Sequence, residues 1–153
     1  MVRLRAVAIA CAFAGVGLVA RAQAPDPRLT IADVEKATGL SGVKQVAQGS
    51  MTGAGGDLNF VGPDGKLILM VKFATASLYD ATKKNQTVFH AVVPDLGDEA
   101  FDAPPGAMQY VLYIKKGTKA VSVTSFISTS RPYAPKLTID QLKAIARVVL
   151  SRL

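Results

Sequence analysis

Two pairs of alternating apolar segments, each joined by a connection of only a few residues, constrain the fold of this chain more than any other feature. In the first pair, Leu58 and Phe60 precede the turn sequence Gly62-Pro63-Asp64-Gly65, and residues 67–73 follow it. Proline presets φ at its position, and Asp-Gly tolerates the positive φ that tight hairpin turns require. Because a connection this short holds no crossover helix, the two strands must be antiparallel neighbours.

The second pair supports the same conclusion. Residues 108–115 and 119–128 are joined through Lys116-Gly117-Thr118, and the second arm is more apolar on one face than on the other. Residues 43–48 predict a further strand. In the first hairpin, the arm over residues 66–74 carries apolar side chains on both faces. This predicts a central strand that is covered on both sides, at least in part.

Helical signals lie at both ends of the strand-rich region. Thr30 is placed to cap a helix that ends at Gly39, and Asp33 lies in its first turn, where the helix dipole favours an acid. The strongest helix starts after Thr138, where Gln141 completes a capping box. Its apolar side chains recur at helical spacing and need a sheet to cover them: Leu142, Ile145, Ala146, Val149, Leu150 and Leu153.

Together these signals predict an α+β fold, a two-layer sandwich in which an antiparallel sheet of about five to six strands is packed by N- and C-terminal helices. Residues 77–84 add a weaker helical turn. We expect one domain over residues 29–153, since a chain of this size is accommodated by one core. The one cysteine is at position 11, so this domain holds no disulfide and depends on its hydrophobic core.

Residues 1–22 have the pattern of a secretory signal peptide. Arg3 and Arg5 precede an uncharged, mostly apolar run that is too short to span a bilayer. Small residues at the end of this run predict cleavage after Ala22, followed by a flexible leader over residues 23–28. The mature protein is therefore expected to be periplasmic or secreted, with no stable membrane span after the signal is removed.

Cys11 allows an alternative for this segment. The preceding Ala8-Ile9-Ala10 loosely resembles a lipobox, in which the cysteine would become a lipidated first residue. The apolar run continues beyond Cys11 to Ala20, which is typical of a cysteine inside a signal peptide. We therefore expect Cys11 to be removed with the signal, and lipidation remains the alternative.

The charge of the chain argues against nucleic-acid binding. The formal net charge is +7, but Arg3, Arg5 and Arg21 lie in the signal segment, which leaves 15 basic against 11 acidic residues, a net of +4. The remaining lysines and arginines are scattered, and no nucleic-acid-binding motif is present. We expect these charges to be solvated surface groups, with no nucleic-acid partner.

The segment from Val93 to Asp102 holds the densest group of acids. Its carboxylates are Asp95, Asp98, Glu99 and Asp102. Carboxylate oxygens suit a hard cation such as Ca²⁺, although this spacing does not match an EF-hand loop. The favoured interpretation is a rigid structural turn that binds no metal. In it Gly97 adopts an unusual backbone angle, Ala100 and Phe101 point inward, and the acids face water.

His90 is the sole histidine of the chain. A histidine can act near neutral pH as a general base or as a metal ligand. A metal site normally needs three or four ligands, and no cysteine or second histidine follows the signal segment. His90 and the four acids are the candidate ligand-binding residues of the chain. We expect His90 to be structural and assign no catalytic residue.

The acidic segment also carries a resemblance. The run Val93-Pro94-Asp95-Leu96-Gly97-Asp98-Glu99-Ala100-Phe101 follows an N-terminal pattern Leu29-Thr30-x-x-Asp33-Val34-x-x-x-x-Gly39. In this combination the chain resembles small exported bacterial proteins and lipoproteins of uncharacterised families, several of which are similar to the PsbP/Mog1-like α/β sandwich. The resemblance covers residues 29–152 in layout and implies a binding or assembly role without shared catalytic residues. The chain departs from the lipoprotein members in lacking a clear lipobox.

These observations predict an exported binding or protein-interaction domain that is not an enzyme and needs no cofactor. Its partner is expected to be an unidentified protein or small ligand in the cell envelope. One alternative is a small envelope hydrolase or metal-dependent enzyme that uses His90 and the Asp95–Asp102 acids. Another is a structural subunit of an envelope assembly. Four aromatic residues are expected in the core, with an exposed ligand platform as a minority interpretation: Tyr110, Tyr113, Phe126 and Tyr133.

Overall fold

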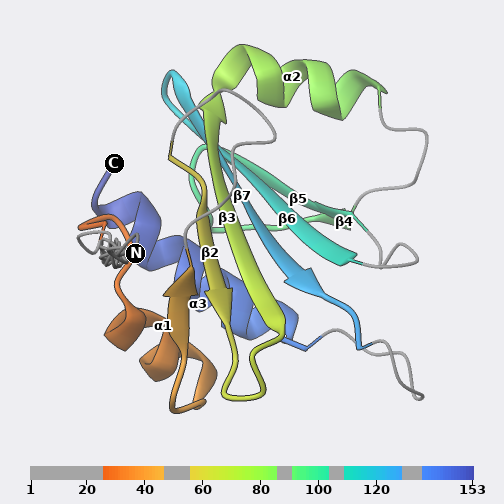
Figure 1. Ribbon diagram of the computed structural model, residues 1–153. Helices are drawn as coiled ribbons and strands as arrows, with labels where there is room; N and C mark the ends of the chain where they lie inside the picture. Colours follow the sequence, from red (N-terminus) through yellow and green to blue (C-terminus); the bar gives the residue numbers. More distant parts are fainter. Residues whose placement is uncertain (1–25, 47–55, 86–90, 104–108, 129–135) are drawn as a thin grey trace, which may run out of the picture.

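The computed structural model describes residues 26–46, 56–85, 91–103, 109–128 and 136–153. Within these ranges the chain forms, in order, α1 (Ile31–Thr38), β1 (Lys44–Val46), β2 (Leu58–Val61), β3 (Leu67–Thr75), α2 (Ala76–Asn85), β4 (Ala91–Val92), β5 (Glu99–Ala103), β6 (Gln109–Lys116), β7 (Lys119–Phe126) and α3 (Ile139–Ser151). Figure 1 shows α3 behind the sheet and α2 across its upper end.

The strands form one sheet in the order β1-β2-β3-β7-β6-β5-β4, and every neighbouring pair is antiparallel. The sheet thus consists of two meanders, β1–β3 and β4–β7, which join where β3 pairs with β7. The antiparallel α+β fold predicted from the hairpins is confirmed. The described strands number seven rather than five to six.

Both hairpin turns use the residues that the sequence singles out. In the β2–β3 turn, the Gly65 N–H donates to the Gly62 carbonyl at 2.9 Å, and the Lys66 N–H donates to Asp64 Oδ1 at 3.1 Å. Gly65 has a φ of 73°, which a residue with a β-carbon adopts only at a cost. In the β6–β7 turn, Gly117 has a φ of 57°. These turns fix the register of the two hairpins.

Helices α1 and α3 begin as their capping residues predict. In α1 the Asp33 N–H donates to Thr30 Oγ1 at 3.3 Å, and the Thr30 N–H donates to Asp33 Oδ2 at 2.9 Å. Thr138 and Gln141 make the equivalent pair in α3. Gly39 ends α1 in the left-handed conformation, with a φ of 72°. Each capping box satisfies two backbone donors that a helix N-terminus otherwise leaves unpaired.

The main core lies between one face of the sheet and the layer formed by α1 and α3. Its fully buried side chains come from both meanders and from both helices and include Val34, Phe60, Leu69, Val71, Leu112, Val123, Leu142 and Ile145. Burial of such side chains stabilises the fold by about 1.5–3 kcal/mol each. This is the two-layer packing that the sequence predicts.

The two helices of this layer are also joined by polar contacts. Gln141 Nε2 donates to the Thr38 carbonyl at 2.8 Å. The guanidinium of Arg152 binds both oxygens of Asp33, at 2.6 and 3.0 Å. The hydrogen bond from Arg152 holds the pKa of the Asp33 carboxyl well below its usual value. The ends of the described chain are thereby tied to each other.

Two segments differ from the expectation. Residues 76–85 form a ten-residue helix, α2, where a weak helical turn is expected. The acidic segment is a turn only in its first half, because Glu99–Ala103 forms β5 and pairs with β6. In β5 Glu99 and Asp102 flank Ala100 and Phe101, and this pattern without apolar–polar alternation hides the strand. Ala100 and Phe101 are buried by tertiary packing that no local pattern encodes.

The leader predicted over residues 23–28 is described from Asp26 onward, and this part contacts the domain. The guanidinium of Arg28 lies 3.6 Å from the centre of the Phe73 ring and binds Asp26 at 2.6 Å. Arg152 Nη1 donates to the Pro27 carbonyl at 3.2 Å. The last residues of the predicted leader are therefore part of the packed structure.

Candidate ligand-binding pocket

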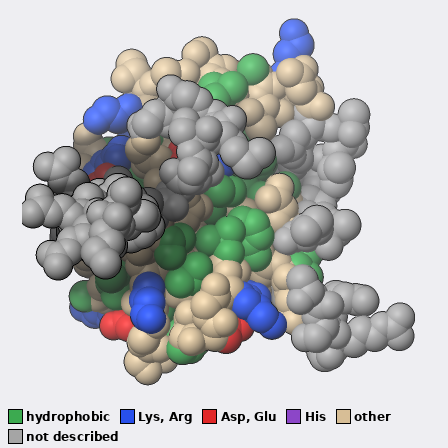
Figure 2. Space-filling view, viewed as in Figure 1, with side chains coloured by type: hydrophobic (Ala, Val, Ile, Leu, Met, Phe, Trp, Pro, Cys, Tyr) green, Lys and Arg blue, Asp and Glu red, His purple; other side chains and the backbone are tan. Residues whose placement is uncertain are grey.

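The face of the sheet opposite α1 and α3 is hollowed beside α2. A pocket of about 380 Å³ lies here between α2 and strands β3, β7 and β6. Figure 2 views this face and shows hydrophobic side chains gathered near its centre. The volume falls within the range of about 300–1,000 Å³ that is usual for small-molecule sites.

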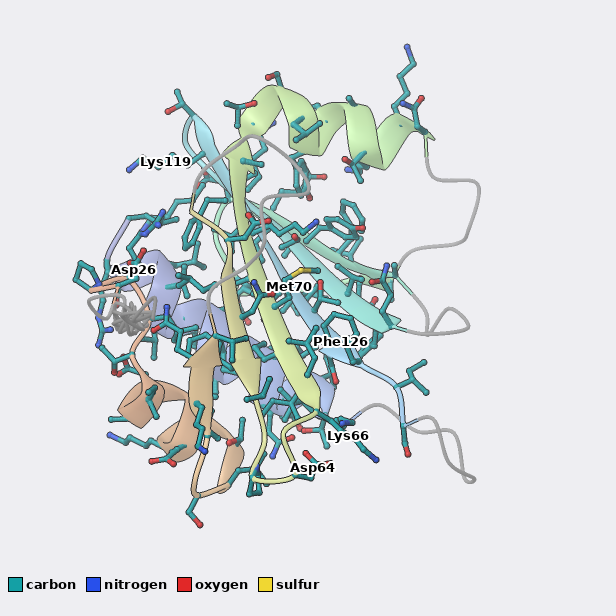
Figure 3. The ribbon with its side chains drawn as sticks, in the orientation of Figure 1. Asp26, Asp64, Lys66, Met70, Lys119 and Phe126 are labelled. Carbon is teal, nitrogen blue, oxygen red and sulfur yellow. The ribbon has the colours of Figure 1, made fainter. Side chains whose placement is uncertain are left out.

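The floor of the pocket is built from rows of paired residues. In one row Thr124 of β7 lies between Met70 of β3 and Val111 of β6, and all three line the pocket. Figure 3 shows Met70 near the centre of this face, with Phe126 further along β7. Thr124 is 2% exposed, so a methyl and a hydroxyl stand where a large apolar side chain would fill the hollow.

In the next row Ser122 lies between Lys72 and Tyr113. The side chains of a strand alternate between its faces, so Val121 and Val123 point toward the core while Ser122 points into the pocket. The pocket thus exists because the open face of β7 carries small hydroxyl residues. A sheet with valines on both faces of β7 would leave less space here.

Helix α2 forms one wall of the pocket through Leu78, Tyr79 and Thr82. Leu78 is 58% exposed, which is unusual for a large apolar residue beside an apolar hollow. Ion pairs also join α2 to the sheet, Lys83 with Glu99 and Lys115 with Asp80. The helix therefore lies over one end of the sheet and leaves the rest of the face open.

Beneath α2, Tyr79 belongs to a second apolar cluster. Its ring lies 5.2 Å from that of Phe101, measured between centroids, and Phe101 stacks on Tyr113 at 4.9 Å. Ala120 completes the buried part of this cluster. The Tyr79 hydroxyl is enclosed, and no partner for it is found in the described part of the chain. Burial, followed by the charges of Glu99 and Asp80, raises the pKa of Tyr79.

Two charged residues of opposite sign line the pocket from adjacent strands. Asp57 precedes β2, and Lys72 lies on β3 next to the position that pairs with Leu58. Gln109 of β6 adds a neutral polar group. The pocket therefore combines an apolar interior with a few polar groups, as is typical of small-ligand sites. Its lining carries no strong charge of either sign.

The structure places the predicted acidic candidates outside this pocket, at the β4–β5 connection and on β5. Asp95 has a positive φ of 60°, and Asp98 Oδ2 accepts the Gly117 N–H at 2.6 Å. Glu99 pairs with Lys83, and Asp102 Oδ2 accepts the Tyr110 hydroxyl at 2.6 Å. Three of these carboxylates therefore hold elements of the fold together.

The turn that carries these acids has the predicted backbone geometry. Gly97 has a φ of 68°, and a β-carbon there would lie 2.5 Å from the Lys115 carbonyl oxygen. Leu96, Ala100 and Phe101 are each at most 3% exposed. The predicted inward orientation of Ala100 and Phe101 is confirmed, and the segment is anchored against the β6–β7 hairpin.

The metal and catalytic hypotheses receive no support from the part of the chain that is described. Among residues 26–46, 56–85, 91–103, 109–128 and 136–153, no three His, Cys, Asp or Glu side chains are grouped so as to hold a metal ion. His90 lies outside the described residues. Its convergence with the Asp95–Asp102 acids therefore stays a prediction.

A second, smaller hollow of about 260 Å³ is lined by Arg28, Lys119 and Arg152. Its three positive charges suggest an anion site at first sight. Arg28 is bound to Asp26 and Arg152 to Asp33, while Lys119 Nζ donates to a backbone carbonyl. Because these cations already have partners, the larger pocket is the better candidate.

The sequence indicated part of the larger pocket. Of the four aromatic residues named as a minority ligand platform, Tyr113 lines the pocket, and Phe126 lies on the same face. Tyr110 points to the other face, and Tyr133 lies outside the described residues. The sequence did not identify Leu78 or Tyr79. In hindsight, a signal for this wall is the weakly amphipathic pattern of residues 76–85, in which Leu78 is a large apolar residue that the helix leaves exposed.

Comparison of the chain with family models, with curated proteins and with solved structures found no match in any of the three. In the described residues, no helix combines the length and the apolar character needed to cross a membrane. The resemblance to PsbP/Mog1-like proteins therefore stays a prediction from sequence, and the candidate function depends on the pocket itself.

Proposed function

We propose that this chain is an exported, non-enzymatic binding domain whose small-molecule ligand occupies the pocket between α2 and the open face of the sheet. The observation that carries this proposal is the hollow of about 380 Å³ on the face opposite the main core. Export is proposed from the signal-like pattern of residues 1–22.

The shape of this surface favours a small ligand over a protein partner. The apolar area is recessed between a helix and a sheet, and the residue that projects at its lip is Leu78. Protein partners usually bury a broad surface of about 800 Å² per side. A recessed pocket with a few polar groups instead suits a molecule that is enclosed on several sides.

The local chemistry favours binding over catalysis. Asp80 of α2 and Glu99 of β5 are paired with lysines, and Asp57 is the carboxylate that lines the pocket itself. The floor offers the hydroxyls of Ser122 and Thr124 beside Met70 and Val111. Such a set of groups can orient a ligand by hydrogen bonds while its apolar part is removed from water.

Native mass spectrometry of the mature domain tests this proposal. The wild-type protein, incubated with an envelope extract and repurified, is expected to carry a bound small molecule. Ser122→Phe fills the floor of the pocket and is expected to abolish the adduct. The control Ser41→Phe places the same side chain at an exposed position between α1 and β1 and should retain it. An adduct that is absent from the wild type, or equally present in Ser122→Phe, contradicts the proposal.

A further inference from the structure

The hydroxyl of Tyr79 is a buried polar group for which the described part of the chain provides no partner. The side chain is 3% exposed, and within the described residues nothing hydrogen bonds to its oxygen. A buried hydroxyl that loses water without gaining another partner lowers the stability of the folded state. Native proteins satisfy most such groups, so this one requires an explanation.

The ring that carries this hydroxyl closes the inner end of the pocket. Tyr79 and Ala120 both line the pocket, and together with Phe101 they form the buried cluster under α2. From Ala120 the floor runs along β6 and β7, past the rows of Ser122 and Thr124, toward Gln109. A ligand that extends along the floor toward α2 therefore meets the Tyr79 ring.

Building on the proposed function, on which this inference rests, we propose that the ligand is a neutral, mainly apolar small molecule with a hydrogen-bond acceptor at one end. The Tyr79 hydroxyl donates to that acceptor when the end of the ligand enters beneath α2. The ligand thereby supplies the partner that the described residues do not provide, and no covalent bond is made or broken.

The charges around Tyr79 favour a neutral acceptor. Burial and the carboxylates of Glu99 and Asp80 raise the pKa of Tyr79, so the phenol keeps its proton at neutral pH and acts as a donor. Each of these carboxylates is paired with a lysine, and Lys115 Nζ lies 5.8 Å from the centre of the Tyr79 ring, so the surroundings of the hydroxyl carry no excess charge that would attract an ionised ligand group. Asp57 and Lys72, which also line the pocket, carry one charge of each sign, so together they favour neither an anionic nor a cationic ligand.

The attachment of α2 is light enough to let the ligand reach the hydroxyl. Tyr79 is the buried residue of this helix. The first residue of the helix is held by the Ala76 N–H, which donates to the Thr118 carbonyl at 2.9 Å. Further along, its polar attachments include the surface ion pairs Lys83–Glu99 and Asp80–Lys115, and exposed pairs of this kind contribute little. A small outward displacement of α2 uncovers the Tyr79 oxygen, and the new hydrogen bond compensates for the contacts that are lost.

A pair of probes of matched shape tests the inference. 2-Acetylnaphthalene is neutral and carries a carbonyl acceptor, while 2-isopropylnaphthalene has nearly the same shape without the acceptor. Their affinities are measured by calorimetric or NMR titration for the wild type and for Tyr79→Phe, which keeps the ring and removes the hydroxyl. Tyr110→Phe is the matched control, because the Tyr110 hydroxyl lies on the other face and already donates to Asp102.

Tyr79→Phe is expected to weaken binding of the acetyl compound about two- to tenfold, the range of one neutral hydrogen bond, and to leave the isopropyl compound unchanged. The urea midpoint of unliganded Tyr79→Phe should rise, because an unpaired buried hydroxyl is removed. Tyr110→Phe should leave both affinities unchanged and lower the midpoint. A lower midpoint for Tyr79→Phe, or equal effects on the two probes, overturns the inference.

The same titrations separate this inference from the proposed function. In one outcome both probes bind the wild type, Ser122→Phe prevents their binding, and Tyr79→Phe changes the two affinities equally. The pocket is then the ligand site, and the role proposed for Tyr79 is wrong. If neither probe binds, or if Ser122→Phe binds them as well as the wild type, the pocket is not the ligand site and both proposals fail.

Discussion

Gly97 occupies a position where no other residue fits without a rearrangement. A β-carbon at this position would lie 2.5 Å from the Lys115 carbonyl oxygen and 2.8 Å from Ile114 Cγ2. The backbone also has a positive φ of 68°. The acidic turn packs directly on the β6–β7 hairpin, and the missing side chain makes this approach possible.

Gly97→Ala should therefore destabilise the protein more than an ordinary left-handed glycine does. The positive φ alone costs about 1–2 kcal/mol for a residue with a β-carbon, and the overlap with β6 adds to this. Urea unfolding measures the change. Gly65→Ala is the control, because Gly65 has a φ of 73° with no atom within 4 Å of a β-carbon. Equal costs for the two variants would contradict the close approach.

Phe101 links the acidic segment to the cluster under α2. It is 2% exposed and contacts the rings of Tyr79 and Tyr113. Phe101→Ala should lower the free energy of unfolding by about 3–5 kcal/mol, as expected for a large aromatic residue removed from a packed site. Glu99→Gln, which changes a surface ion pair, should cost less. A Phe101→Ala variant as stable as Glu99→Gln would mean that the ring is not buried.

The structural role assigned to Asp98 predicts that calcium leaves the stability unchanged. Its carboxylate already accepts the Gly117 N–H at 2.6 Å and so clamps the turn to the hairpin. Thermal melts with and without Ca²⁺ should coincide for the wild type. A melting temperature that rises with Ca²⁺ in the wild type and not in Asp98→Asn would show a cation site, because a ligand that binds only the folded state stabilises it.

At the scale of elements, the contact between α1 and α3 has a pH dependence. The Arg152 hydrogen bond, together with those from Thr30, lowers the pKa of Asp33 below its usual value of 3.8. A carboxyl with a lowered pKa in the folded state stabilises it above the usual pKa. This contribution is lost as the pH falls below that value.

Arg152→Gln removes the ion pair and leaves the Thr30 capping box in place. Its urea midpoint should lie below that of the wild type at pH 7. The difference should shrink as the pH falls below about 4, where the Asp33 carboxyl of the unfolded chain begins to bind protons while that of the folded wild type stays ionised. Lys143→Gln, which removes one positive charge from the same helix, is the control. A difference that persists unchanged at pH 2 would show that Arg152 acts through packing alone.

The elements that the sequence predicts well are those encoded by a few neighbouring residues. The capping boxes at Thr30 and Thr138 and the turn at Gly65 each depend on residues within four positions of each other. Strand β5 depends instead on pairing with β6, and it lacks the alternation of apolar and polar residues that would reveal it in the sequence. Local signals therefore locate the ends of helices and hairpins, and they miss an element that forms only through tertiary pairing.

The pocket was largely beyond prediction for the same reason. Its floor combines β3, β7 and β6, and β3 and β7 lie about fifty residues apart. The small residues Ser122 and Thr124 are visible in the sequence, but the hollow above them depends on where α2 lies. The burial of Tyr79, with a hydroxyl that no described residue pairs, follows from this packing and has no local signature.

At the scale of the whole molecule, the signal-like segment predicts that the protein is exported and where its mature chain begins. We expect intact-mass analysis of protein recovered from the periplasm or the medium to show a first residue of Gln23. Lipidation of Cys11 would instead give a membrane-bound species that is heavier and is lost in Cys11→Ser. Ala22→Arg, which removes the small residue before the predicted cleavage point, should prevent this cleavage.

The joining of the two meanders has a consequence for how the protein can be assembled. A break between α2 and β4 would leave α1 and β1–β3 on one fragment, and β4–β7 and α3 on the other. Each fragment would keep its own hairpin turn, and the seam from Leu69↔Ser125 to Thr75↔Lys119 would be made between separate chains. The domain is thus suited to fragment complementation, in which two separate fragments form one shared core when β3 of one pairs with β7 of the other.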